Sequence, residues 1–186
     1  MSRNVFIFHG TGGNPNENWF PWLKEKFEKT GYTVFVPQFP TPEGQSVKAW
    51  RKILDGYEEY INKDTIFIGH SLGGLFLLRL LEQLPHKVKG AYFVGTPIGI
   101  RPLLNYERDS AFSGGFDFNR DELKKKADTF VVFHSDNDPY VCLENGKELA
   151  KHLGIELSFV PNAGHFNAKA GYLAFDELWE KLQSIL

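Results

Sequence analysis

The stretch Thr65-Ile66-Phe67-Ile68-Gly69-His70-Ser71-Leu72-Gly73-Gly74 decides the fold prediction for this chain. A short run typical of a buried strand leads into a Gly-x-Ser-x-Gly sequence, and a leucine-rich stretch with helical spacing, 72–84, follows directly. A sharp turn from strand to helix strains the backbone of the central serine, so the residues two before and two after it must be small. Gly69 and Gly73 meet this requirement, and Ser71 is therefore the candidate nucleophile.

The same alternation of strand and helix patterns extends along the whole chain. Short apolar runs bounded by Gly, Pro, Asn or Asp predict six strands, at 5–8, 33–36, 65–68, 90–94, 129–133 and 156–160. Helical spacing appears at 19–29, 46–61, 72–84, 121–126, 143–153 and 171–186. The alternation predicts an α/β protein with a mainly parallel sheet and helices on both faces, because parallel neighbours need crossover connections. No repeat or long linker divides the chain, so residues 1–186 are expected to form one domain.

One stretch, residues 96–120, does not follow the pattern. Three glycines and two prolines interrupt it, which argues against long regular elements and suggests a small flap over the site. Sites in open parallel sheets lie beyond the carboxyl ends of the strands, where such a flap would sit.

Composition excludes several classes of function. A formal net charge of −2 lacks the basic footprint of nucleic-acid binding, and no apolar run approaches the roughly 20 residues that cross a bilayer. Cys142 is the only cysteine and cannot form an intrachain disulfide. The N-terminus shows no signal-peptide pattern, so we expect a cytoplasmic protein that acts on a small molecule.

A glycine-rich loop, His9-Gly10-Thr11-Gly12-Gly13, follows the first predicted strand. Backbone N–H groups at this place, with that of Leu72 at the start of the helix after Ser71, are suited to bind an oxyanion, and Thr11 is the expected donor. The loop could also suggest a dinucleotide site. That alternative fails because Pro15 stands where the third glycine belongs and no acid follows the second strand.

The base and the acid are expected on loops after later strands, in the order serine, acid, histidine. His165, in a loop between the last strand and the last helix, is the candidate base. For the acid, Asp136 and Asp138 lie on one loop. Asp136 is placed to brace the turn, whereas Asp138 precedes Pro139 and is biased to an extended backbone, so the residues favour Asp138 without excluding Asp136.

These motifs resemble the α/β-hydrolase superfamily, and within it the small cap-less serine hydrolase family of the retinoblastoma-binding protein 9 type. The stretches that carry the resemblance are 9–10, 19–22, 37–42 with Trp50, 68–71, 136–139 and 164–166. The resemblance implies the strand order 2-1-3-4-5-6 and no cap domain. It also implies that the acid is the aspartate directly before the proline, which makes the triad Ser71, Asp138 and His165. The family's Leu-x-Cys-x-Glu interaction motif is disrupted here, because Tyr140 replaces the leucine two residues before Cys142.

Taken together, the residues predict a serine hydrolase that cleaves ester-type bonds through an acyl-enzyme, with no metal or organic cofactor. The resemblance implies short acyl chains, because a chain without a cap has little apolar surface for long ones. Two alternatives remain at this point: the same triad acting on an amide, thioester or lactone, and a non-catalytic interaction module that keeps the fold, with an unknown protein partner.

Overall fold

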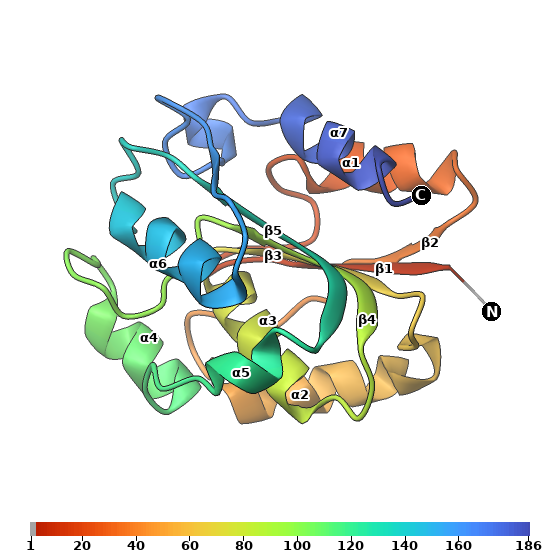
Figure 1. Cartoon of the computed structure of the whole chain (residues 1–186), viewed down its shortest axis with the longest axis horizontal. Helices are drawn as coiled ribbons and strands as arrows, with labels where there is room; N and C mark the ends of the chain where they lie inside the picture. Colours follow the sequence, from red (N-terminus) through yellow and green to blue (C-terminus); the bar gives the residue numbers. More distant parts are fainter. Residues whose placement is uncertain (1–2) are drawn as a thin grey trace.

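A six-stranded parallel sheet runs through the middle of the molecule (Figure 1). The structure is a computed structural model that describes residues 3–186. Its strands are β1 (Asn4–Phe8), β2 (Thr33–Phe35), β3 (Ile66–His70), β4 (Val88–Val94), β5 (Ala127–His134) and β6 (Ser158–Phe159). Their order is β2-β1-β3-β4-β5-β6, and every neighbouring pair is parallel. The expected sheet and strand order are confirmed, although β6 at the edge is shorter than its apolar run.

Helices cover both faces of the sheet, as predicted. Two of them, α1 (Phe20–Glu28) and α7 (Asp176–Gln183), lie on one face. The other face carries α2 (Val47–Leu54), α3 (Leu72–Gln83), α4 (Tyr106–Ser113), α5 (Arg120–Leu123) and α6 (Leu143–Leu153) (Figure 1). Within residues 3–186 no cap domain is inserted, and no helix there is long and apolar enough to cross a bilayer.

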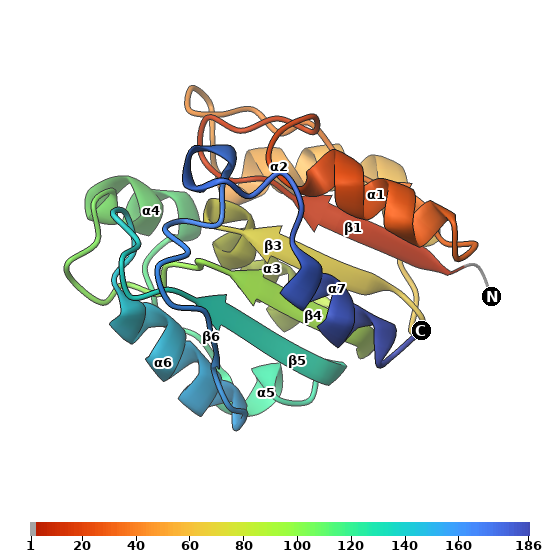
Figure 2. The same ribbon diagram turned by 90° about the horizontal axis from the view of Figure 1, so that it is seen from above.

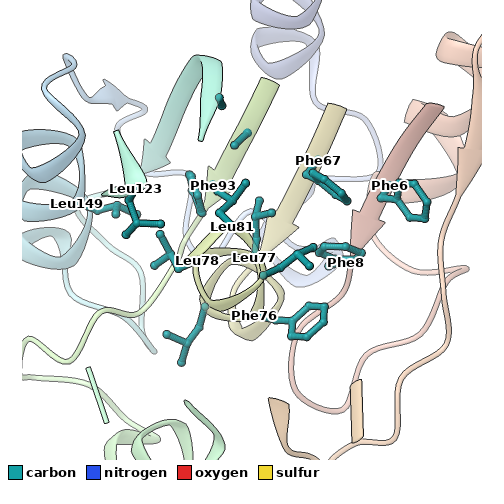
Figure 3. Close-up of a cluster of buried hydrophobic side chains, with 14 of the residues drawn as sticks. Phe6, Phe8, Phe67, Phe76, Leu77, Leu78, Leu81, Phe93, Leu123 and Leu149 are labelled. Carbon is teal, nitrogen blue, oxygen red and sulfur yellow. The ribbon is translucent and has the colours of Figure 1, made fainter. Parts of the chain in front are cut away.

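Side chains along each strand alternate between two apolar cores. On β1, Phe6 and Phe8 join the core under α2 and α3, while Val5 and Ile7 join the core under α1 and α7. Figure 3 shows the first core, where the rings of Phe6, Phe8 and Phe67 line the sheet and face the leucines of α3. Burial of each such side chain contributes about 1.5–3 kcal/mol to folding, and it fixes which face of every strand looks toward α3.

The two longest predicted helices are much shorter in the structure. The stretch 46–61 splits into α2 and a 3-10 helix, Asp55–Tyr60, because Gly56 is a poor helix former. The stretch 171–186 becomes helical only at Asp176, since Gly171, with φ of 89°, closes a 3-10 turn and Phe175 is fully buried among other aromatic rings.

Helix α4 lies inside the stretch predicted to be irregular. Tertiary contacts create it: Phe112 packs edge-on against Trp50, with ring centroids 4.9 Å apart, and Arg79 of α3 holds its C-terminal end. The Arg79 guanidinium donates to the carbonyls of Ser113, Gly115 and Asp117 at 2.8–3.2 Å. Figure 2 shows α4 beyond the carboxyl ends of β3 and β4. We name residues 96–120 the α4 segment.

Candidate active site

Ser71 occupies a tight turn at the carboxyl end of β3. Its backbone has φ of 54° and ψ of −122°, a conformation rare for a residue with a side chain. The turn is held because the Ser71 N–H donates to the carbonyl of Val94 at 2.8 Å. Close approach also requires glycine at position 73, where a Cβ atom would lie 2.2 Å from the carbonyl oxygen of Phe8. The Gly-x-Ser-x-Gly sequence therefore forms the strained turn that its spacing predicts.

His165 lies on a loop between β6 and α7, which we name the His165 loop (residues 162–166). Three of its residues, Asn162, Gly164 and Phe166, have positive φ, so the chain is bent sharply on both sides of the imidazole. Three consecutive side chains after β5 accept hydrogen bonds of 2.7–2.9 Å from three loop N–H groups. The pairs are Asp136 with Asn162, Ser135 with Ala163, and Asn137 with Gly164. These bonds hold an otherwise unfavourable loop conformation in place.

Asp138 is the carboxylate that meets the imidazole. The Nδ1–H of His165 donates to its Oδ2 at 2.6 Å, while its Oδ1 accepts from the backbone N–H groups of Tyr140 and Val141 at 2.9 and 3.1 Å. The Asp138 side chain is completely buried. Burial acts to raise its pKa, but the hydrogen bond and charge of His165, with the two N–H groups, hold the pKa below its ordinary value. Asp138 is therefore ionised at neutral pH.

Asp136, on the same loop, has a different structural role. Its Oδ1 accepts from the N–H of Asn162, and this bond lowers the pKa of the exposed carboxyl. Of the two aspartates that the sequence left open, Asp136 braces the His165 loop and Asp138 contacts the imidazole.

His70, next to Ser71, is a site residue whose role sequence reasoning did not identify. Its Nε2 lies 2.8 Å from the carbonyl oxygen of His165. A carbonyl can only accept, so Nε2 carries the proton and Nδ1 is left with a lone pair. Burial, and next the charge of His165, lower the pKa of His70 to about 3. His70 is thus a neutral donor that ties the main chain of His165 to the end of β3.

Ser71 and His165 line one pocket of about 440 Å³, a size suited to a small ligand. Its wall is formed by the glycine-rich loop, the α4 segment, Tyr140 and Val141 after β5, and residues 167–169. Among the side chains of residues 3–186, none is a hydrogen-bond partner of Ser71 Oγ, which is left available to the pocket. The α4 segment contributes Leu103, Asn105 and Asp109 to this wall.

The glycine-rich loop passes directly beside the serine. A Cβ atom on Gly10 would lie 2.9 Å from Cβ of Ser71, so only glycine permits this approach. His9 fixes the loop, because its Nε2 accepts from the N–H of Phe39 while its Nδ1–H donates to the carbonyl of Gly10. In the described part of the chain, the N–H groups of Thr11 and Leu72 donate to no other residue.

Residues 3–186 contain no group of three or more His, Cys, Asp or Glu side chains arranged to hold a metal ion.

Cys142 is half-buried at the start of α6, with Sγ 3.5 Å from the carbonyl oxygen of Ile100.

The fold and the site together define the class of protein. A parallel sheet in the order 2-1-3-4-5-6, with a strained serine between β3 and α3, is the α/β-hydrolase fold. Within that class, the family model described as "Serine hydrolase" matches residues 5–184, and the chain belongs to this family.

Individual relatives agree with this assignment. The chain is 28% identical to YdeN from Bacillus subtilis (strain 168) over 186 residues, covering 99% of this chain and 96% of YdeN. It is 24% identical to the serine hydrolase RBBP9 from Rattus norvegicus, covering 97% and 94% of the two chains. The crystal structure of the B. subtilis ydeN gene product superimposes with a TM-score of 0.89, at 26% identity and 99% and 98% coverage.

Proposed function

We propose that the protein hydrolyses small esters through Ser71 as nucleophile, His165 as general base and Asp138 as the carboxylate that orients the imidazole. The observation that carries this proposal is the 2.6 Å hydrogen bond between Asp138 and His165, because His165 lines the same pocket as Ser71. A carboxylate in this position selects the tautomer whose Nε2 can accept a proton from a serine hydroxyl.

The reaction follows the two steps of acyl transfer. Ser71 Oγ attacks the ester carbonyl carbon as its proton passes to His165 Nε2. The imidazolium, stabilised by Asp138, then gives that proton to the leaving alcohol, and an acyl-Ser71 remains. Water attacks the acyl-enzyme in the same manner, releases the acid and returns the proton to the serine.

The oxyanion of both steps is assigned to the N–H groups of Thr11 and Leu72. Both are free of other partners in the described chain, and they belong to the glycine-rich loop that passes beside the serine and to the N-terminus of α3. The N-terminal end of a helix also favours negative charge. Neither donor needs to move from a competing hydrogen bond before the oxyanion forms.

A small acyl group fits the pocket that these residues line. The wall facing Ser71 comes from the short α4 segment and from loops, and the volume of about 440 Å³ matches a compact substrate. We therefore expect 4-nitrophenyl acetate and butanoate to be cleaved faster than esters of long fatty acids.

Fluorophosphonate labelling tests the nucleophile. The wild-type protein should be labelled and should cleave 4-nitrophenyl acetate, and Ser71→Ala should lose labelling and at least about 10³-fold in kcat. Ser184→Ala, an exposed serine at the end of α7, is the matched control and should behave as wild type. Undiminished labelling and turnover in Ser71→Ala would contradict the proposal, and a wild type that neither reacts nor turns over would favour a non-catalytic interaction module.

A further inference from the structure

Asp109, on α4, is a buried carboxyl group that the proposed chemistry does not use. Only 4% of the residue is exposed. Within residues 3–186 its side chain has neither a hydrogen bond nor an ion pair, although the group lines the pocket that holds Ser71 and His165. Buried polar groups are almost always paired, so a lone buried carboxyl facing a pocket requires a physical explanation.

One buried polar side chain that supports the α4 segment has its partners within the fold. Asn145, fully buried on α6, accepts from the N–H groups of Ile98 and Ile100 and donates to the carbonyl of Ile100, and so anchors the start of the α4 segment. Asp109 lies on the same segment and has no such function in the fold. We therefore expect that a ligand bound in the pocket supplies the partner of the Asp109 carboxyl group.

The charged groups around Asp109 leave it uncompensated. The pocket also holds His165, the half-buried Glu17 and the exposed Lys169, while Arg108 on the same helix is exposed. Burial raises the pKa of Asp109 to about 7, against the smaller opposing effects of Arg108 and His165, and burial raises the pKa of Glu17 as well. The pocket thus presents two desolvated carboxyl groups and one solvated ammonium.

We propose that Asp109 is a specificity-determining residue that binds a cationic amine group of the substrate. This inference rests on the proposed ester hydrolysis and names its substrate class: esters that carry an ammonium group on the acyl or the alcohol part. An opposite charge compensates a desolvated carboxylate better than a neutral hydroxyl does, and a substrate carboxylate would be repelled. The amine thereby orients the ester carbonyl toward Ser71.

Two pairs of substrates of equal shape test the proposal. On the acyl side, 4-nitrophenyl β-alaninate is compared with 4-nitrophenyl butanoate, in which a methyl replaces the ammonium group. On the alcohol side, butyrylthiocholine is compared with S-(3,3-dimethylbutyl) thiobutanoate, in which a tert-butyl group replaces trimethylammonium. At pH 8 we expect kcat/KM to favour the charged member of at least one pair by about tenfold or more.

The variant Asp109→Asn should remove that preference, so that kcat/KM for the charged and the neutral member of each pair becomes equal within about threefold. Glu107→Gln is the matched control, because it makes the same charge change on the same helix but its side chain is 87% exposed. It should keep the wild-type preference. The preference for the charged ester should also increase between pH 6 and pH 8, as Asp109 ionises, and any pH dependence that both esters share cancels in the ratio.

Failure of this inference can be told apart from failure of the proposed function. Ser71-dependent hydrolysis of the neutral esters, with no charge preference in either pair or with one that survives in Asp109→Asn, would overturn the role of Asp109 alone. A second measurement does not need turnover: n-butylammonium should slow fluorophosphonate labelling of wild type more than 1-butanol does. This extra protection should disappear in Asp109→Asn, and equal protection in both proteins would overturn the inference. Absence of both labelling and turnover in wild type would overturn both proposals.

Discussion

The His165 loop and the α4 segment both line the pocket, and they are held in different ways. The loop is fixed by polar partners along its length: three side chains after β5, the imidazole of His70, and the indole N–H of Trp19, which donates to the carbonyl of Phe166 at 2.9 Å. The α4 segment is held before α4 by Asn145 and by the pairing of Leu103 with Val141, and after α4 by Arg79, while Phe112 packs against Trp50. Between these anchors Asp109 faces the pocket unpaired.

This difference separates two tasks. A general base must be placed to within a fraction of an ångström, and several hydrogen bonds hold the loop that carries it. A wall that selects the substrate must keep a polar group available for it, which costs stability in the free protein. Substitutions on the loop should therefore reduce turnover, whereas substitutions on α4 should alter stability and selectivity.

The largest expected effect comes from Asp138→Asn. The carboxamide still accepts from the N–H groups of Tyr140 and Val141, but its NH₂ group would donate to His165 Nδ1 and shift the proton to Nε2, the wrong tautomer. We expect kcat for 4-nitrophenyl acetate to fall by roughly 10⁴-fold with the circular dichroism spectrum unchanged. Asp136→Asn, the same change two residues away, should keep activity within about threefold. Equal losses in the two variants would show that the loop brace and the proposed triad carboxylate cannot be separated.

The next effect is on stability. The pKa of Asp109 is about 7 in the folded protein, above the ordinary value of 3.8, so the folded state binds the proton more tightly than the unfolded state. The penalty for an ionised Asp109 is absent below pH 4, grows as the pH rises and is complete above about pH 7. Asp109→Asn should therefore be more stable than wild type at pH 8, by on the order of 4 kcal/mol, and by little at pH 4.

Urea unfolding at the two pH values measures this change. Glu107→Gln should shift the free energy of unfolding by less than about 0.5 kcal/mol at either pH. If Asp109→Asn were less stable than wild type at pH 8, the carboxylate would have a structural partner and the contrast between the two walls would be wrong.

The smallest expected effect concerns His70 as a positioning residue. His70→Leu removes the donor to the carbonyl of His165 and should lower kcat about tenfold, with KM nearly unchanged, because the imidazole moves while the pocket wall stays. In His70→Gln the amide nitrogen can take the place of Nε2–H, and kcat should recover to within about threefold of wild type. A loss in KM, or equal losses of kcat in the two variants, would assign His70 to substrate contact or to packing instead.

Much of the fold and part of the candidate site could be predicted from the sequence. The spacing of apolar residues and glycines predicted the six strands and their parallel arrangement, and the resemblance to a known family supplied the order of the strands. The glycines around Ser71 predicted a tight turn. These features depend on local sterics and periodicity, which neighbouring residues encode.

The remainder depends on contacts between distant parts of the chain. Asp138, and not Asp136, contacts His165 because hydrogen bonds hold two loops together, although Asp138 and His165 are 27 residues apart in the sequence. His70 contacts the same histidine although it precedes it by 95 residues. Helix α4 forms because Arg79 and Trp50 hold it, although its own sequence suggests an irregular segment. Local pattern specifies each element, but the pairing and burial of charged groups exist only once the sheet has brought those elements together.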